Sequence, residues 1–127
     1  MPAHGFLGLG GLLAAAAVAL GALGAHAFKN CLAPQQLETF HTAVHYHMIH
    51  AIGLIIVGLL SLHRRCVMWD AAGWAMLAGI VLFSGCLYLW VATGSRALMY
   101  LVPLGGTAFI LGWVALAWGA WGSPRLL

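Results

Sequence analysis

The sequence predicts an all-α membrane protein, folded as a compact four-helix transmembrane bundle. Of its 127 residues, 64% are hydrophobic and only 6% carry a formal charge. Its apolar residues also fall into four runs. A bilayer crossing takes about 20 apolar residues, so the chain has room for four crossings with short loops and none for a soluble domain. We therefore expect a single integral membrane domain over residues 1–127.

Each span is expected from an apolar run bounded by polar or turn-forming residues. The polar segment around Pro34 separates the first two runs, His63-Arg64-Arg65 ends the second, and Gly94-Ser95-Arg96 forms a tight turn after the third. A cleavable secretory signal is the alternative for the first run, but no Lys or Arg precedes it. The expected spans are residues 6–28, 37–62, 69–93 and 98–121. Four tryptophans fall near span ends, where an aromatic belt is expected: Trp69, Trp90, Trp118 and Trp121.

The charged residues indicate membrane edges and an orientation. The net charge of +3 is dispersed at the ends of the apolar runs, without the basic stripe that nucleic-acid binding needs. With four spans, both termini and the Arg64 loop share one side of the membrane. That side holds three Lys or Arg residues and the other side holds two. This excess predicts that both termini face the cytoplasm.

Small residues predict where helices approach one another closely. Ala17, Gly21 and Ala25 lie at four-residue intervals, which places them on one face of the first span. Glycine within a helix lowers stability unless it allows a neighbouring helix to approach closely. We therefore expect further helix contacts at Gly85, Gly105 and Gly106. Pro103 is expected to free a carbonyl one turn earlier in the fourth span.

The second span begins with too many polar residues for a lipid-facing anchor. At about 100° per residue, Glu38, His41 and His45 share one face. Thr42, Tyr46 and His50 share the adjacent face, and His47 points elsewhere. His50 should lie about 10 Å inside the hydrocarbon, where an unsatisfied imidazole costs several kcal/mol. We expect it to face the bundle and to have a hydrogen-bond partner.

Other spans bring polar residues to the same half of the membrane. We predict a buried polar network or ligand pocket in that half, with His26, Tyr46, His50 and Tyr88 converging in the bundle interior. The cytoplasmic halves of the spans contain few such residues. The residues expected in the network are His26, Thr42, Tyr46, His50, Ser84 and Tyr88.

Four ordered motifs carry a family resemblance: GALGAHAF (21–28), TAVHYHMIHA (42–51), LFSGCLYL (82–89) and VPLGGTAFILGW (102–113). The chain resembles the small membrane proteins typified by bacterial YgdD and animal transmembrane protein 256, which are grouped as domain of unknown function 423. The resemblance implies a four-span protein, placed in the inner membrane in bacteria, and no catalytic role. The family pattern falls on His26, Thr42, Tyr46, His50, Ser84, Gly85, Tyr88, Pro103, Gly105 and Gly106. The sequence departs from the pattern at His47, Cys86 and Val102, where the family commonly has Gln, Ser and Thr.

Several functions fit these residues. The leading hypothesis is a structural or accessory component, attached to a partner membrane protein or to further copies of the chain, without enzymatic activity or a cofactor. The first alternative is a copper or zinc module on His41 and His45, with Glu38 or His26 as a further ligand. Glu38 and His45 lie about 10 Å apart along the axis, too far to share one ion directly with His41. A haem between His26 and His50 and a solute or proton transporter are further alternatives. An enzyme is disfavoured because Glu38 and Asp70 should lie on opposite sides of the membrane.

Overall fold

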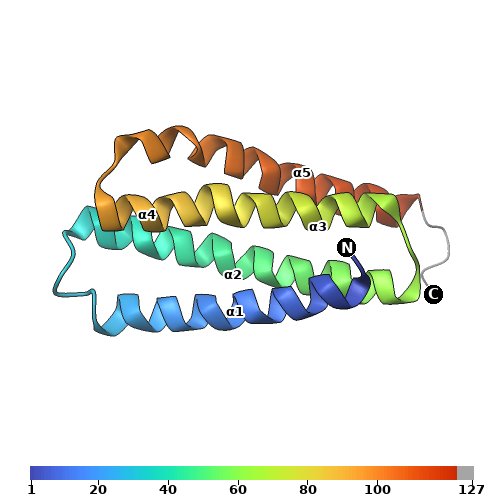
Figure 1. Cartoon of the computed structure of the whole chain (residues 1–127), viewed down its shortest axis with the longest axis horizontal. Coiled ribbons are helices and arrows are strands. Elements are labelled where there is room, and N and C mark those ends of the chain that lie inside the picture. Colours follow the sequence, from blue (N-terminus) through green and yellow to red (C-terminus); the bar gives the residue numbers. More distant parts are fainter. Residues whose placement is uncertain (123–127) are drawn as a thin grey trace.

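The computed structural model describes residues 1–122 as a bundle of long helices (Figure 1). Four helices are long and apolar enough to cross a membrane, which confirms the all-α membrane fold. The third membrane-spanning helix, Val67–Thr93, is continuous, because a π-helical segment, η1, joins its α-helical parts α3 and α4. The fourth, Arg96–Trp121, begins with the 3₁₀ turn η2. The elements are α1 (Ala3–His26), α2 (Pro34–His63), α3 (Val67–Gly79), η1 (Ile80–Gly85), α4 (Cys86–Thr93), η2 (Arg96–Tyr100) and α5 (Val102–Trp121).

The loops alternate between the two ends of the bundle (Figure 1). The N-terminus, the connection between α2 and α3 and the last turn of α5 lie at one end, and the α1–α2 loop and the Gly94 turn lie at the other. Gly94 has a φ of 71°, the left-handed conformation that ends many helices and favours glycine. This arrangement agrees with the expected even number of spans. Arg125, counted above in the charge balance, lies outside the described residues.

A seam of small residues packs α1 against α2. The buried positions Gly10, Ala17 and Gly24 recur every seven residues, the repeat of a left-handed helix pair. A Cβ added at Gly10 would lie 2.9 Å from the Ala51 carbonyl oxygen, so the two backbones approach closely there. The four-residue spacing expected for this face is therefore wrong. Gly21 makes only ordinary contact with Val44, and Ala25 is exposed.

A second seven-residue seam, Gly105, Gly112 and Gly119, packs α5 against α3 and η1. A Cβ added at Gly105 would collide with the backbone nitrogen of Phe83, so the expected helix contact at Gly105 is confirmed. α1 and α5 thus lie on opposite sides of the α2 and α3 pair (Figure 1).

The expected close contacts at Gly85 and Gly106 are wrong. An added Cβ at Gly106 would meet the Phe83 side chain at 3.8 Å, which is ordinary van der Waals distance. At Gly85 its nearest neighbour would be the Ile80 carbonyl oxygen of the same helical segment, at 3.6 Å. Gly106 lies beside the seam because Gly105 occupies the position of α5 that faces η1.

Pro103 also has a simpler role than expected. It lies in the first turn of α5 and is exposed. Backbone N–H groups in the first turn have no partner within the helix, so a residue that lacks one costs little there. Pro103 therefore helps to start α5 and does not interrupt it.

The core in the half that contains the N-terminus is apolar. Trp69 is fully buried, with its indole against Gly119, and does not belong to an interfacial belt. Trp118 and Trp121 are exposed at the end of α5, as expected for interfacial residues. The buried cluster consists of Phe6, Leu54, Val57, Trp69, Ala72, Met76, Ile80 and Phe109.

Candidate functional site

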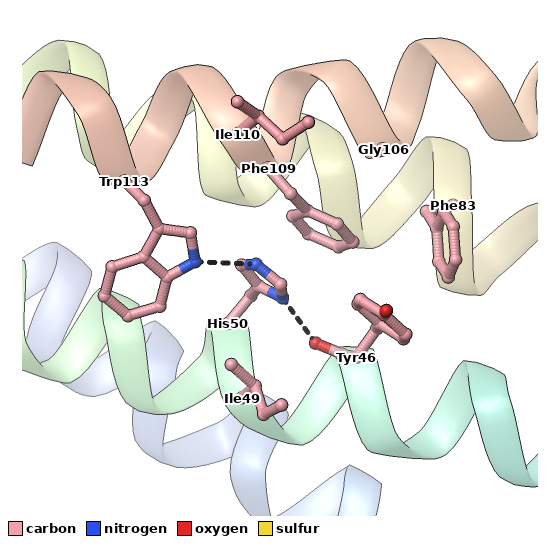
Figure 2. Close-up of a pocket in the computed structure, with 8 residues that line it drawn as sticks. All are labelled: Tyr46, Ile49, His50, Phe83, Gly106, Phe109, Ile110 and Trp113. Atoms are coloured by element: carbon pink, nitrogen blue, oxygen red, sulfur yellow. Dashed lines mark hydrogen bonds between the residues drawn. The ribbon is translucent and has the colours of Figure 1, made fainter.

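His50 is the centre of a hydrogen-bonded link between α2 and α5 (Figure 2). The indole N–H of Trp113 donates to His50 Nε2 at 3.0 Å, and His50 Nδ1 lies 2.7 Å from the Tyr46 carbonyl oxygen. An indole nitrogen can only donate, so Nε2 must accept and Nδ1 must carry the proton. His50 is 3% exposed and both of its ring nitrogens are used. The expectation that it is buried with a polar partner is confirmed.

Aromatic rings surround this link. The His50 ring stacks on Phe109 with a centroid separation of 3.4 Å and an angle of 11° between the rings. Tyr46 packs against Phe83 at 4.8 Å and lies nearly parallel to His50 and Phe109. The stack joins residues of α2, η1 and α5, so it contributes to the packing of three segments.

A groove opens on the outer surface beside the stack, between α2 and α5. Its volume is about 380 Å³. Figure 2 shows Trp113 at one end of the groove and Phe83 at the other, with His50 and Phe109 between them. The groove is lined by Tyr46, Ile49, His50, Phe83, Gly106, Phe109, Ile110 and Trp113.

A second polar link joins α2 to α4. His47 Nδ1 and the Tyr88 hydroxyl share a hydrogen bond of 3.0 Å, and His47 is 4% exposed. Nearby, the Ser84 hydroxyl donates to the Ala43 carbonyl at 2.8 Å. His47 Nε2 is buried and has no hydrogen-bond partner among residues 1–122. His47 does not share a link with His50, as expected from its position on the helix, but it lies on the buried seam of α2 and was not expected among the interior polar residues.

The expected convergence of four residues is wrong at two of them. His26 is exposed at the end of α1 and makes none of the hydrogen bonds found among the described residues. Tyr46 is 40% exposed at the rim of the groove and contributes its backbone carbonyl to the link. His50 and Tyr88 belong to separate links, one to α5 and one to α4. Thr42 is half-buried and joins neither link. The alternative of a haem between His26 and His50 is disfavoured, since both His50 nitrogens are hydrogen-bonded and His26 is exposed.

The histidines near the start of α2 lie on the surface. Glu38, His41 and His45 are all exposed. Within residues 1–122, no three His, Cys, Asp or Glu side chains are grouped closely enough to hold a metal ion. A metal on His41 and His45 would therefore need ligands from water or from another molecule.

Comparison with known sequences places the chain in a family. A sequence profile described as "Protein of unknown function (DUF423)" matches residues 20–106. The chain belongs to the DUF423 family. The matched segment contains both histidines of the two links, Tyr88, which pairs with His47, and Ser84, which bonds to the Ala43 carbonyl, whereas Trp113 lies beyond it.

Relatives within the DUF423 family are similar over most of their length. The UPF0382 membrane protein YwdK of Bacillus subtilis is 44% identical over 112 residues, which cover 87% of this chain and 91% of the relative. A UPF0382 membrane protein of Haemophilus influenzae is 36% identical over 110 residues, 86% of this chain and 87% of the relative. The chain is therefore a multi-pass membrane protein of this family. No solved structure matches it.

Two members of the links in this DUF423 chain were not predicted, His47 and Trp113. The signal for His47 is the heptad spacing of buried residues in α2: Phe40, Ala43, His47, His50, Leu54 and Val57. No local sequence pattern indicates that Trp113 takes part in a link. It is an apolar residue in an apolar span, and only its contact with His50 makes its N–H significant.

Proposed function

We propose that the protein is a non-catalytic accessory component of the cytoplasmic membrane that acts through contacts made within the bilayer. The strongest support is that buried polar side chains form hydrogen bonds within the protein. His50 bonds to the Tyr46 carbonyl within α2 and to Trp113 of α5, and Ser84 of η1 bonds to the Ala43 carbonyl of α2. Such links fix helix register in membrane bundles, and they use both ring nitrogens of His50 and the hydroxyl proton of Ser84.

The distribution of polar groups also favours this role over transport. A transporter needs polar groups along its path through the hydrocarbon. In the described residues, the buried polar side chains besides Trp69 are His47, His50 and Ser84, and the half that contains the N-terminus is packed with apolar side chains. A path for an ion through that half would require contacts from another subunit.

Extraction from native membranes tests the accessory role. We expect polymer nanodiscs prepared without detergent to contain a second membrane protein in a fixed ratio to this chain. Tryptophan substitutions at lipid-facing Leu12 or Leu111, both well exposed, should lower that ratio if they fall on the contact face. A matched interior variant, Leu54→Met at a fully buried position, should leave it unchanged.

The opposite result has two parts. The nanodiscs would contain this protein alone, and the purified protein in vesicles would by itself transport a solute or turn over a substrate. That outcome would overturn the accessory role in favour of transport or catalysis.

The native cysteines can test the proposed cytoplasmic location of both termini. Cys31 is exposed in the α1–α2 loop, Cys66 lies at the opposite end of the bundle and Cys86 is buried. With both termini in the cytoplasm, a membrane-impermeant maleimide should label Cys31 in intact bacterial cells, and Cys66 only after the membrane is opened. Variants that retain one cysteine each assign the signal. Labelling of Cys66 but not Cys31 in intact cells would reverse the orientation.

A further inference from the structure

The groove between α2 and α5 has the composition of a small-molecule site. Its volume of about 380 Å³ falls within the usual range for ligand pockets, which are mostly apolar with a few placed polar groups. Four of its lining residues are aromatic: Tyr46, Phe83, Phe109 and Trp113. None of the lining residues carries a formal charge, and the groove opens toward the hydrocarbon. A ligand that enters it must therefore be neutral and soluble in lipid.

One polar group in the groove is left for a ligand. The Trp113 N–H and both His50 ring nitrogens already have partners. The Tyr46 hydroxyl has no hydrogen-bond partner among residues 1–122, and its side chain lies at the Phe83 end of the groove (Figure 2). A hydroxyl in hydrocarbon is costly unless it finds an acceptor. A lipid acyl chain offers no acceptor to the Tyr46 hydroxyl, whereas a ring carbonyl does.

We propose that this groove binds the ring of a membrane-soluble quinone. The planar ring packs against the aromatic walls, one carbonyl accepts a hydrogen bond from the Tyr46 hydroxyl, and the apolar tail extends into the bilayer past Ile110. Gly106 leaves space for the ring, because an added Cβ there would come no closer than 3.8 Å to Phe83. The proposal concerns binding and includes no electron transfer.

The test uses the purified full chain in phosphatidylcholine nanodiscs with decylubiquinone as the probe. Quinone retained above that in empty nanodiscs is measured as its mole fraction in lipid rises. We expect saturation at one quinone per chain. Tyr46→Phe should weaken binding about fivefold, the typical effect of one hydrogen bond. Gly106→Leu should abolish saturable binding by filling the groove.

Control variants keep the test decisive. Ile110→Trp fills the groove mouth from a lipid-facing position, so it serves if Gly106→Leu fails to fold. Ala92→Leu instead fills a separate groove of about 480 Å³ beside α1 and α4, and should not change binding. The proposal is overturned if retention never saturates, if dodecane displaces the quinone equally well, or if folded Gly106→Leu or Ile110→Trp binds like the parent. Such failure would leave the accessory role standing, since no partner takes part in this experiment.

Discussion

Gly105→Ala is expected to destabilise the bundle by about 2–3 kcal/mol, although it adds only one methyl group. The new Cβ would collide with the backbone of Phe83 in η1. A flexible side chain could move aside, but a backbone nitrogen cannot move without shifting the whole segment. α5 and η1 must therefore separate, which loosens the contacts that hold Phe109 against its neighbours. The measurement is the free energy of unfolding in detergent micelles or bicelles.

Two neighbouring glycines provide matched controls for Gly105→Ala. An added Cβ at Gly106 or Gly85 meets nothing closer than 3.6 Å. Gly106→Ala and Gly85→Ala should therefore be neutral, or stabilising by up to about 1 kcal/mol because alanine favours the helix. A loss of stability at Gly106 equal to that at Gly105 would contradict the packing of α5 on η1.

The four spans could be predicted from the sequence because hydrocarbon imposes a simple requirement. Each crossing needs a long apolar helix, and polar or turn-forming residues must lie between crossings. The expected second span, 37–62, differs from α2 (Pro34–His63) only at its ends. The same reasoning identified His50 as a residue that must find a partner, since an imidazole so deep cannot remain unsatisfied.

The partners and the seams could not be predicted in the same way. The pattern of polar residues in the second span favoured the face of Tyr46 and His50, whereas the helix buries the seven-residue seam that contains His47 and His50. Around the helix axis, the buried seam and the polar face are less than a third of a turn apart. As a result Tyr46, which was expected to be buried, lies at the rim of the groove, and His47 is buried instead. Packing against α1 and α4 selects the seam, and this information is not local to α2.

The π-helical segment is another feature that sequence alone did not indicate. A π turn takes one more residue per hydrogen bond than an α turn. In η1 this directs Ser84 toward the Ala43 carbonyl of α2, while Phe83 lines the groove beside α5. Ser84 and Gly85 weaken the α-helix locally, but no pattern in this segment specifies a π turn, so the π register also depends on contacts with both neighbouring helices.

Removing the His50 ring should have an effect as large as that of Gly105→Ala. His50→Ala deletes a buried ring that stacks on Phe109 and leaves the Trp113 N–H without its acceptor. The cavity alone should cost about 3 kcal/mol, by analogy with other large-to-small changes in protein cores. His63→Ala is the matched control, because His63 makes the same type of bond to a carbonyl four residues earlier but is exposed. Its cost should stay within about 0.5 kcal/mol.

A double-mutant cycle separates the hydrogen bond from the packing. His50→Phe keeps an aromatic ring against Phe109 but removes both nitrogens, and Trp113→Phe removes the donor. If the bond at 3.0 Å stabilises the bundle, the two changes together should cost less than the sum of their separate costs, by about 0.6–1.7 kcal/mol. Additive costs would show that the bond from Trp113 to His50 contributes nothing to stability. In that case the link between α2 and α5 would depend on aromatic stacking, while the Nδ1 bond to the Tyr46 carbonyl, which lies within α2, would still hold the proton on Nδ1.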